Sequence, residues 1–278
     1  MFDPNEKKEE NNMKAVFVGL FLIILIATIT VLKSNSENKN ISENKSGVAP
    51  AETIDPAKIG KITPEELVKK NQIIPRPFLL DIRDENQYKN EHIIDSVNIT
   101  LSKLSAISNA LGTDKEYVLV DDSGDASIIT AAANTLTSKG YKHLYYLDGG
   151  FSVWKNNYNP TINSGNQKSF TDQAKVKYIT SDNLKKLMEA EKNLLLIDVR
   201  QSAEFNAGHL NGAINIFLDD LETRKKELPL GRKIVLYDNT NLGAFKGAVR
   251  LFDLGFFNTL ALSDGLDSWK AKGYEITK

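Results

Sequence analysis

Two aspartates stand where a side chain at the end of a strand could take part in chemistry. Asp121 ends the apolar run YVLVD and Asp238 ends the run KIVLYD, and a polar loop follows each. A carboxylate in such a place can act as a general base or as a nucleophile. No positioned acid or histidine accompanies either aspartate. We therefore expect each carboxylate to accept N–H hydrogen bonds from its own loop and to hold the turn in shape.

Composition limits cysteine and histidine chemistry. The chain of 278 residues has no cysteine, which excludes thiol nucleophiles, disulfides and iron–sulfur clusters. Its three histidines, His92, His143 and His209, are too few and too scattered for a histidine-rich metal site. We therefore expect neither a metal nor a cofactor. A formal net charge of −1 provides no global field that would attract nucleic acid.

The loops after the two aspartates differ in charge. Counted from Asp121, the first carries three acidic residues and no Lys or Arg, so it would repel an anionic substrate. The second carries one Lys at its far end. The candidate residues of a cleft beside these loops are Asp122, Ser123, Gly124, Asp125, Asn239, Thr240, Asn241 and Lys246.

The same landmarks occur twice at a fixed spacing. Asp81 recurs as Asp198 and Asp121 recurs as Asp238, each 117 residues later, which predicts two copies of one unit. We interpret the two Asp-x-Arg pairs as structural ion pairs and the two histidines as satisfied turn residues. The two tryptophans should pack the final helix of each copy, after a glycine turn. These structural residues are Asp81, Arg83, His92, Trp154, Asp198, Arg200, His209 and Trp269.

Each copy alternates short apolar runs with helical stretches. Thr63, Pro64 and Glu66 form a capping-box pattern at the start of a helix, and Thr180 holds the same place in the second copy. Runs such as FLLDI and LLLIDV are typical of strands buried on both faces, and helices are expected over 128–139 and 244–254. Each copy is therefore predicted to be an α/β domain of about 100 residues with a parallel sheet.

The N-terminal part of the chain predicts a membrane anchor. Residues 15–32 are 18 uncharged, mostly apolar residues, and a helix of this length reaches roughly 27 Å, close to the hydrocarbon thickness of a bilayer. A cleaved signal peptide is the alternative. Residues 1–14 form a polar tail, and residues 33–57 are rich in Asn, Ser, Glu and Lys, which predicts a flexible linker.

The side of the membrane follows from the short tail. Lysines flank the apolar segment on both sides, so the positive-inside rule does not decide the orientation. A tail of 14 residues is more easily kept in the cytosol. We therefore expect a single-pass protein of the cytoplasmic membrane with its domains outside the cytoplasm.

Several motifs give the chain a resemblance to the rhodanese family. These are the strand ends LLDIR and LIDVR, the stretch EFNAGHLNGAINI, the strand-to-loop segments YVLVDDSG and IVLYDNTN, and the turns LDGGFSVW and LSDGLDSW. The resemblance implies two tandem domains, each a five-stranded parallel sheet flanked by helices. They are expected over residues 58–160 and 176–278, with a linker at 161–175.

The resemblance also implies what is missing. In active members of the family, a cysteine at the end of the central strand takes a sulfane sulfur as a persulfide, and Asp121 and Asp238 match that position. A carboxylate cannot hold a persulfide. Its charge would also compete with an anionic substrate for the N–H groups of the loop. Aspartate here resembles the non-catalytic half of many two-domain rhodaneses.

Two hypotheses of function follow. In the first, the chain is a membrane-anchored tandem rhodanese-like pseudoenzyme without sulfurtransferase activity, acting as a binding or scaffolding module for a protein partner in the cell envelope. In the second, it is a sulfurtransferase-related enzyme or accessory subunit that uses a partner's thiol or a non-cysteine mechanism. The absence of cysteine favours the first.

Overall fold

The structure is a computed structural model that describes residues 59–106 and 111–278. The expected tail, membrane segment and linker, residues 1–57, lie outside these described residues. Within the described ranges, no helix is long and apolar enough to cross a membrane.

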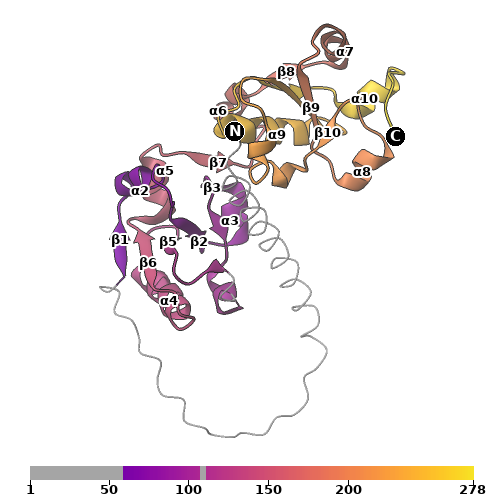
Figure 1. Cartoon of the computed structure of the whole chain (residues 1–278). Coiled ribbons are helices and arrows are strands. Elements are labelled where there is room, and N and C mark those ends of the chain that lie inside the picture. The colour runs from indigo at the N-terminus through magenta and orange to yellow at the C-terminus, as the bar shows by residue number, and fades with distance from the viewer. Residues whose placement is uncertain (1–58, 107–110) are drawn as a thin grey trace, which may run out of the picture. The chain divides into compact units, whose positions relative to one another are not determined.

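The first repeat places its strands in one parallel sheet between helices (Figure 1). The sheet order is β1-β6-β5-β2-β4, so β5 is the central strand. All four pairings are parallel, as predicted. The elements of this repeat are β1 (Gly60–Ile62), α2 (Pro64–Lys70), β2 (Phe78–Asp81), α3 (Glu85–Asn90), β3 (Glu91–Ile93), β4 (Val97–Asn98), the 3-10 helix η2 (Leu101–Ala106), β5 (Glu116–Val120), α4 (Ala126–Thr137), β6 (His143–Leu147) and α5 (Gly150–Asn156).

The predicted linker between the repeats contains regular structure. β7 (Thr161–Asn163) pairs with β3 as an antiparallel two-stranded sheet, and α6 (Phe170–Lys175) follows it. Ser169 caps α6 by accepting a hydrogen bond from the backbone N–H of Asp172. The strand depends on a partner about 70 residues away in sequence, which explains why local composition did not reveal it.

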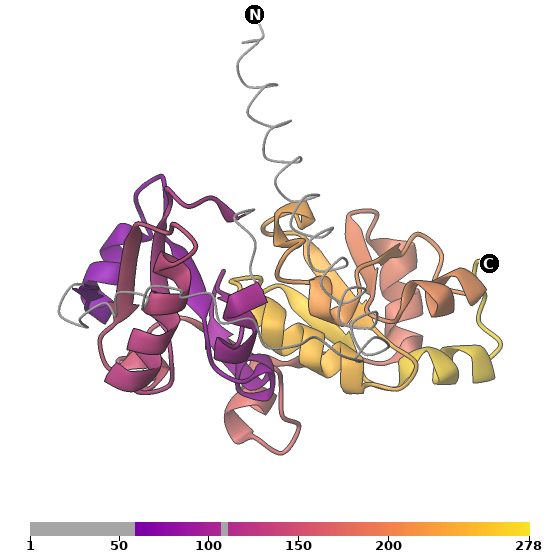
Figure 2. The same cartoon turned by 90° about the horizontal axis from the view of Figure 1, so that it is seen from below.

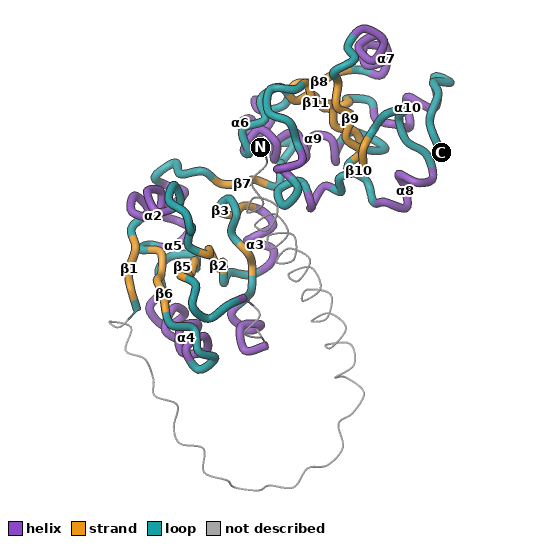
Figure 3. The backbone as a smooth tube through the Cα atoms, in the orientation of Figure 1, coloured by secondary structure: helices purple, strands orange, loops and turns teal. Residues whose placement is uncertain are grey.

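The second repeat has the same architecture, as its strands in Figure 3 show. Its sheet order is β10-β9-β11-β12-β8, all parallel, with β11 at the centre. The predicted fold of two five-stranded parallel α/β units is confirmed. The elements are β8 (Lys177–Ile179), α7 (Ser181–Ala190), β9 (Leu194–Asp198), α8 (Ser202–Ala207), β10 (Ile214–Asn215), η4 (Leu218–Asp220), η5 (Lys225–Glu227), β11 (Lys233–Tyr237), α9 (Leu242–Asp253), β12 (Thr259–Leu262) and α10 (Gly265–Ala271).

Both faces of each central strand are buried, because helices lie on both sides of the sheet (Figure 2). In the second repeat, Val235 and Tyr237 of β11 belong to a core cluster that includes Trp269 of α10. The alternate residues Ile234 and Leu236 belong to another cluster, with α9. The first repeat follows the same rule, since Val118 and Val120 of β5 pack with α2 and α5. This double burial explains the continuous apolar runs in the sequence.

The predicted capping box at the start of α2 is present. Thr63 accepts a hydrogen bond from the backbone N–H of Glu66, and the Glu66 carboxylate accepts one from the backbone N–H of Thr63. Thr180 caps α7 by accepting from the N–H of Asn183. The two central helices start two residues earlier than the sequence suggested, α4 at Ala126 and α9 at Leu242.

Candidate functional site

The loop after β5 is organised by the carboxylate of Asp121, which is only 2% exposed. This carboxylate accepts hydrogen bonds from the backbone N–H groups of Gly124 and Asp125, both at 2.8 Å, and of Ser123 at 3.3 Å. The geometry agrees with the expectation that the aspartate holds its own turn. The N–H groups that could stabilise a bound anion are thus already occupied by a charge of the chain.

The other acidic residues of this loop have different roles. Asp125 caps α4, since its carboxylate accepts from the backbone N–H groups of Ser127 and Ile128, which explains the early start of that helix. The Ser127 hydroxyl, followed by these two N–H groups, lowers the pKa of Asp125. Asp122 and Ser123 are exposed on the loop surface.

The loop after β11 uses the same strand-end carboxylate with other donors. Asp238, which is half-buried, accepts hydrogen bonds from the backbone N–H groups of Gly243 at 2.9 Å and Ala244 at 3.3 Å. The Thr240 hydroxyl lies 3.5 Å from it. Gly243 and Ala244 belong to the first turn of α9, so Asp238 satisfies N–H groups that have no partner within the helix.

The remaining candidates of the second loop lie around this turn. Asn241 donates from its side-chain amide to the backbone carbonyl of Ser263 at 3.1 Å. Lys246 lies in the second turn of α9 and makes no ion pair with any residue in the described ranges. It therefore does not supply a positive charge to the Asp238 carboxylate.

A glycine backs each loop at the start of the last helix. The backbone N–H of Phe151 donates to the carbonyl of Asp121 at 2.8 Å, and that of Leu266 donates to the carbonyl of Asp238 at the same distance. Gly150 has φ of +60° and Gly265 has φ of +69°. A Cβ on Gly150 would lie 2.6 Å from the backbone nitrogen of Ser123. The glycines therefore permit the close approach of helix and loop.

The two Asp-x-Arg motifs form buried ion pairs of identical geometry. Nε and Nη2 of Arg83 contact the carboxylate of Asp81 at 2.7 to 3.1 Å, and Nη2 also donates to the carbonyl of Glu91 at 2.9 Å. Asp198 and Arg200 repeat this arrangement. Burial alone would lower the pKa of Arg200, but the hydrogen bonds and charge of Asp198 raise it above its ordinary value.

The predicted structural histidines and tryptophans also occupy matched places. His92 stacks on Tyr88 with ring centroids 3.9 Å apart and contacts its backbone carbonyl through Nδ1 at 2.8 Å. His209 stacks on Phe205 in the same way, at 3.8 Å. The indole N–H groups of Trp154 and Trp269 each donate to a backbone carbonyl, and both rings are buried. His143 lies on β6 with an exposed side chain.

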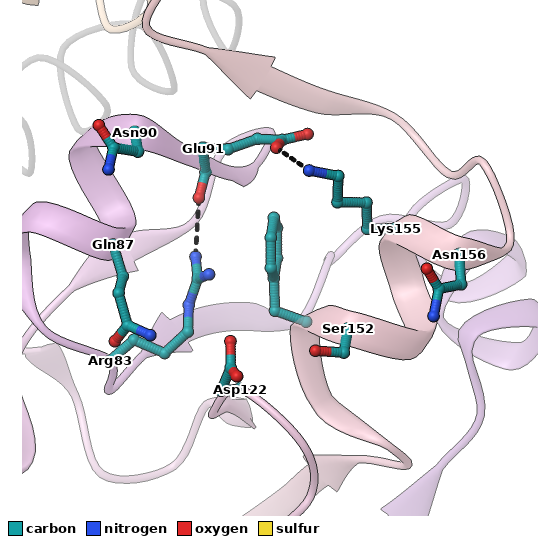
Figure 4. A pocket seen from close by; sticks show the side chains of 9 residues that line it. Arg83, Gln87, Asn90, Glu91, Asp122, Ser152, Lys155 and Asn156 are labelled. Atoms are coloured by element: carbon teal, nitrogen blue, oxygen red, sulfur yellow. Dashed lines mark hydrogen bonds and ion pairs between the residues drawn. The ribbon is translucent and has the colours of Figure 1, made fainter.

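A pocket of about 380 Å³ opens beside the loop of the first repeat (Figure 4). Asp122 and Ser152 lie on one side of it, and Glu91 and Lys155 lie on the other. Lys155 is ion-paired with Glu91 at 2.5 Å. The lining residues are Arg83, Gln87, Asn90, Glu91, Asp122, Phe151, Ser152, Lys155 and Asn156.

The corresponding place in the second repeat carries a side-chain bridge. The side-chain oxygen of Asn239 accepts from Nη1 of Arg200 at 3.0 Å, and its NH₂ group donates to the carboxylate of Glu204 at 2.7 Å. Asn239 thus bridges the arginine and the helix α8. In the first repeat the equivalent loop residue is Asp122, and no ion pair joins it to Arg83 in the described part of the chain.

Among the described residues, no group of three or more His, Cys, Asp or Glu side chains could hold a metal ion.

Comparison with known proteins places these two repeats in a family. Residues 63–157 and 180–272 both match the profile of the rhodanese-like domain, and together they make up more than half of the chain. The chain belongs to the rhodanese family. Asp121 and Asp238 therefore stand where the family resemblance puts the reactive cysteine, in a chain that has none.

The curated relatives match a segment about the length of one repeat, whereas one solved structure covers most of the chain. The chain is 33% identical over 90 residues to thiosulfate sulfurtransferase GlpE of Coxiella burnetii, which covers 32% of this chain and 78% of that protein. It is 37% identical over 76 residues to Uncharacterized protein YqhL of Bacillus subtilis, covering 27% of this chain and 59% of the relative. A crystal structure of thiosulfate sulfurtransferase from Pseudomonas aeruginosa covers 79% of this chain and 43% of its own, with 21% identity and a TM-score of 0.42.

Sequence reasoning found the loops of these rhodanese-like repeats but missed the pocket. It assigned Arg83 a purely structural role, whereas the arginine also lines the pocket. Gln87 of α3 and Lys155 of α5 were not singled out. The sequence held one signal of the pocket, since Asp122 and Asn239 differ at equivalent positions of the two repeats. The local sequence does not show that either residue lies near an arginine from another part of the chain.

The contact between the first loop and Gly150 gives a stability prediction. Gly150→Ala combines a positive φ with a Cβ 2.6 Å from backbone, whereas Gly140→Ala, with φ of +88°, meets its nearest atom at 3.7 Å. We expect the control to lower the free energy of unfolding by about 1 kcal/mol and Gly150→Ala to lower it by about 1–3 kcal/mol more. Urea unfolding of the chain followed by Trp154 fluorescence, in a Trp269→Phe background, measures both. Equal losses would show that the loop does not press on the helix.

Proposed function

We propose that the chain is a membrane-anchored tandem rhodanese-like protein that binds a partner and has no sulfurtransferase activity of its own. The observation that carries this proposal is the same in both repeats. A carboxylate follows the central strand and accepts backbone N–H hydrogen bonds, from three loop residues at Asp121 and from two residues of the first turn of α9 at Asp238.

Sulfur transfer requires an atom that these strand ends do not offer. A sulfane sulfur is carried on a thiolate as a persulfide, and a carboxylate oxygen forms no stable equivalent. The loop N–H groups would have to stabilise the negative charge of the sulfur donor and of the intermediate. Here those groups stabilise the charge of the aspartate instead, so an anion that entered would meet both a repelling charge and a shortage of donors.

The pocket of the first repeat supports the binding role. It lies beside the loop, and its lining combines the Lys155–Glu91 ion pair and the guanidinium of Arg83 with amide and hydroxyl groups that could recognise a ligand. In the second repeat, Asn239 occupies the matching place. This difference suggests that the first repeat recognises the partner while the second closes its own site. We expect the partner to be a protein of the cell envelope.

The named activity of the relatives provides the competing proposal. GlpE is a thiosulfate sulfurtransferase by name, so the chain could serve a related reaction in which a partner's thiol carries the sulfur. In that case the pocket would receive a persulfide presented by another protein.

Catalysis by the chain alone can be tested with thiosulfate and cyanide. We expect thiocyanate formation by the full-length protein in detergent to equal that of the buffer, because no group can accept the sulfur. Asp121→Cys and Asp238→Cys should each stay at least about a hundredfold below GlpE assayed in parallel. The first loop keeps Asp122 and Asp125, which repel an anionic sulfur donor, and the second has no arginine and only Lys246 at its far end. Thiocyanate formation near that of GlpE, by the chain or by either variant, would refute the proposal.

The anchoring of the chain needs a separate test. We expect the full-length protein to sediment with membranes and to resist extraction by high salt and alkaline carbonate, because a span of 18 uncharged, mostly apolar residues inserts through hydrophobic transfer rather than charge. A variant with Leu22→Lys and Leu25→Lys should move to the soluble fraction. Release of the unchanged protein by carbonate would contradict an integral anchor.

A further inference from the structure

The pocket of the first repeat is lined by a buried arginine, Arg83, and one nitrogen of its guanidinium group donates no hydrogen bond to the described residues. The side chain of Arg83 is 4% exposed, and Phe151 covers it with its ring centroid 3.8 Å from the guanidinium carbon. Nε and Nη2 are used by Asp81 and by the Glu91 carbonyl. Nη1 has no acceptor among residues 59–106 and 111–278, yet it is not sealed from solvent. It therefore offers a hydrogen-bond donor to whatever occupies the pocket.

A carboxylate faces the same opening without a partner. The side chain of Asp122 makes no hydrogen bond or ion pair within the described part of the chain. The other charges of the pocket cancel, since Arg83 is paired with Asp81 and Lys155 with Glu91. When Asp81, which is fully buried and does not line the pocket, is counted with Arg83, these groups carry one net negative charge, that of Asp122. This charge favours a cationic donor on the ligand.

The second repeat shows which chemical group fits between these elements. There the amide of Asn239 presents a carbonyl oxygen to Nη1 of Arg200 and an N–H to the carboxylate of Glu204. In the first repeat, Gln87 replaces the glutamate of the helix and Asp122 replaces the amide of the loop. The carboxylate has moved to the loop and the amide to the helix, where the side-chain oxygen of Gln87 accepts from the backbone N–H of Asp84 at 3.3 Å. No carbonyl oxygen of these two side chains accepts from Nη1 of Arg83. The missing group thus combines a carbonyl oxygen with a nearby N–H donor.

We propose that the pocket of the first repeat binds an ammonium group adjacent to a carbonyl, as found at the free N-terminus of a peptide. The ammonium pairs with Asp122, and the first carbonyl oxygen accepts from Nη1 of Arg83. A ligand of charge +1 neutralises the pocket, and the volume of about 380 Å³ suits a terminal residue. This inference rests on the proposed binding function and names the chemistry of its ligand.

The test uses small probes that separate the two groups of the ligand. L-alaninamide carries both the ammonium and the carbonyl, N-acetyl-L-alaninamide lacks the charge, and ethylamine lacks the carbonyl. With the full-length protein in detergent, calorimetric titration should show saturable binding of L-alaninamide. The other two probes should bind at least about tenfold more weakly, because each loses a hydrogen bond to a charged group.

Two further probes identify the source of the ligand. L-alanine carries a carboxylate and has no net charge, so it should bind more weakly than L-alaninamide, and acetate should not bind. Tighter binding of L-alanine would assign the pocket to free amino acids and overturn the peptide assignment. Binding of acetate in preference to L-alaninamide would overturn the charge argument as a whole.

Variants place the binding in this pocket. Asp122→Asn should weaken L-alaninamide binding at least about tenfold, and Gln87→Glu with Asp122→Asn should abolish it by recreating the bridge seen at Asn239. Asp114→Asn removes the same charge from an exposed side chain outside the pocket lining and should change nothing. All variants should retain the thermal unfolding of the parent.

Different results would overturn the ligand assignment and the proposed function. Unchanged affinity in Asp122→Asn, or no binding of L-alaninamide, would overturn the ligand assignment. Thiocyanate formation from thiosulfate would instead overturn the proposed function.

Discussion

The site of both repeats depends on one interaction, a carboxylate after the central strand that accepts backbone N–H groups from the following loop or from the first turn of the following helix. An α/β sheet of this kind directs its loop donors toward the carboxyl end of the central strand, where a ligand would bind. Asp121 places its own charge among those donors. The carboxylate thus holds the loop in shape without a bound anion, and the proposed lack of sulfurtransferase activity rests on the same atoms.

The two repeats keep one frame and differ at its opening. The buried Asp-x-Arg pair, the stacked histidine and the glycine that backs the loop are geometrically equivalent in both. The differences lie in the loop itself, where Asp122 faces an open pocket and Asn239 bridges Arg200 and Glu204. The two repeats thus differ at two facing positions, one on the loop and one on the neighbouring helix.

The sequence predicted the features that depend on residues close together in the chain. The apolar runs predicted parallel strands buried on both faces, and the capping box at Thr63 is present. Features that need distant partners were missed. The strand β7 forms only against β3, and the pocket joins Arg83 and Lys155, which are 72 residues apart in sequence. The early start of α4 follows from the side chain of Asp125, which was seen as a charge rather than as a cap.

The central claim is that the strand-end carboxylate occupies the donors an anion would need. The most direct measurement is the position of the amide resonances of Gly124 and Asp125 in NMR spectra during a titration with thiosulfate. The account predicts that both resonances stay in place up to concentrations that saturate GlpE. Saturable shifts of these two amides would show that the loop still accepts an anion, and would contradict the account.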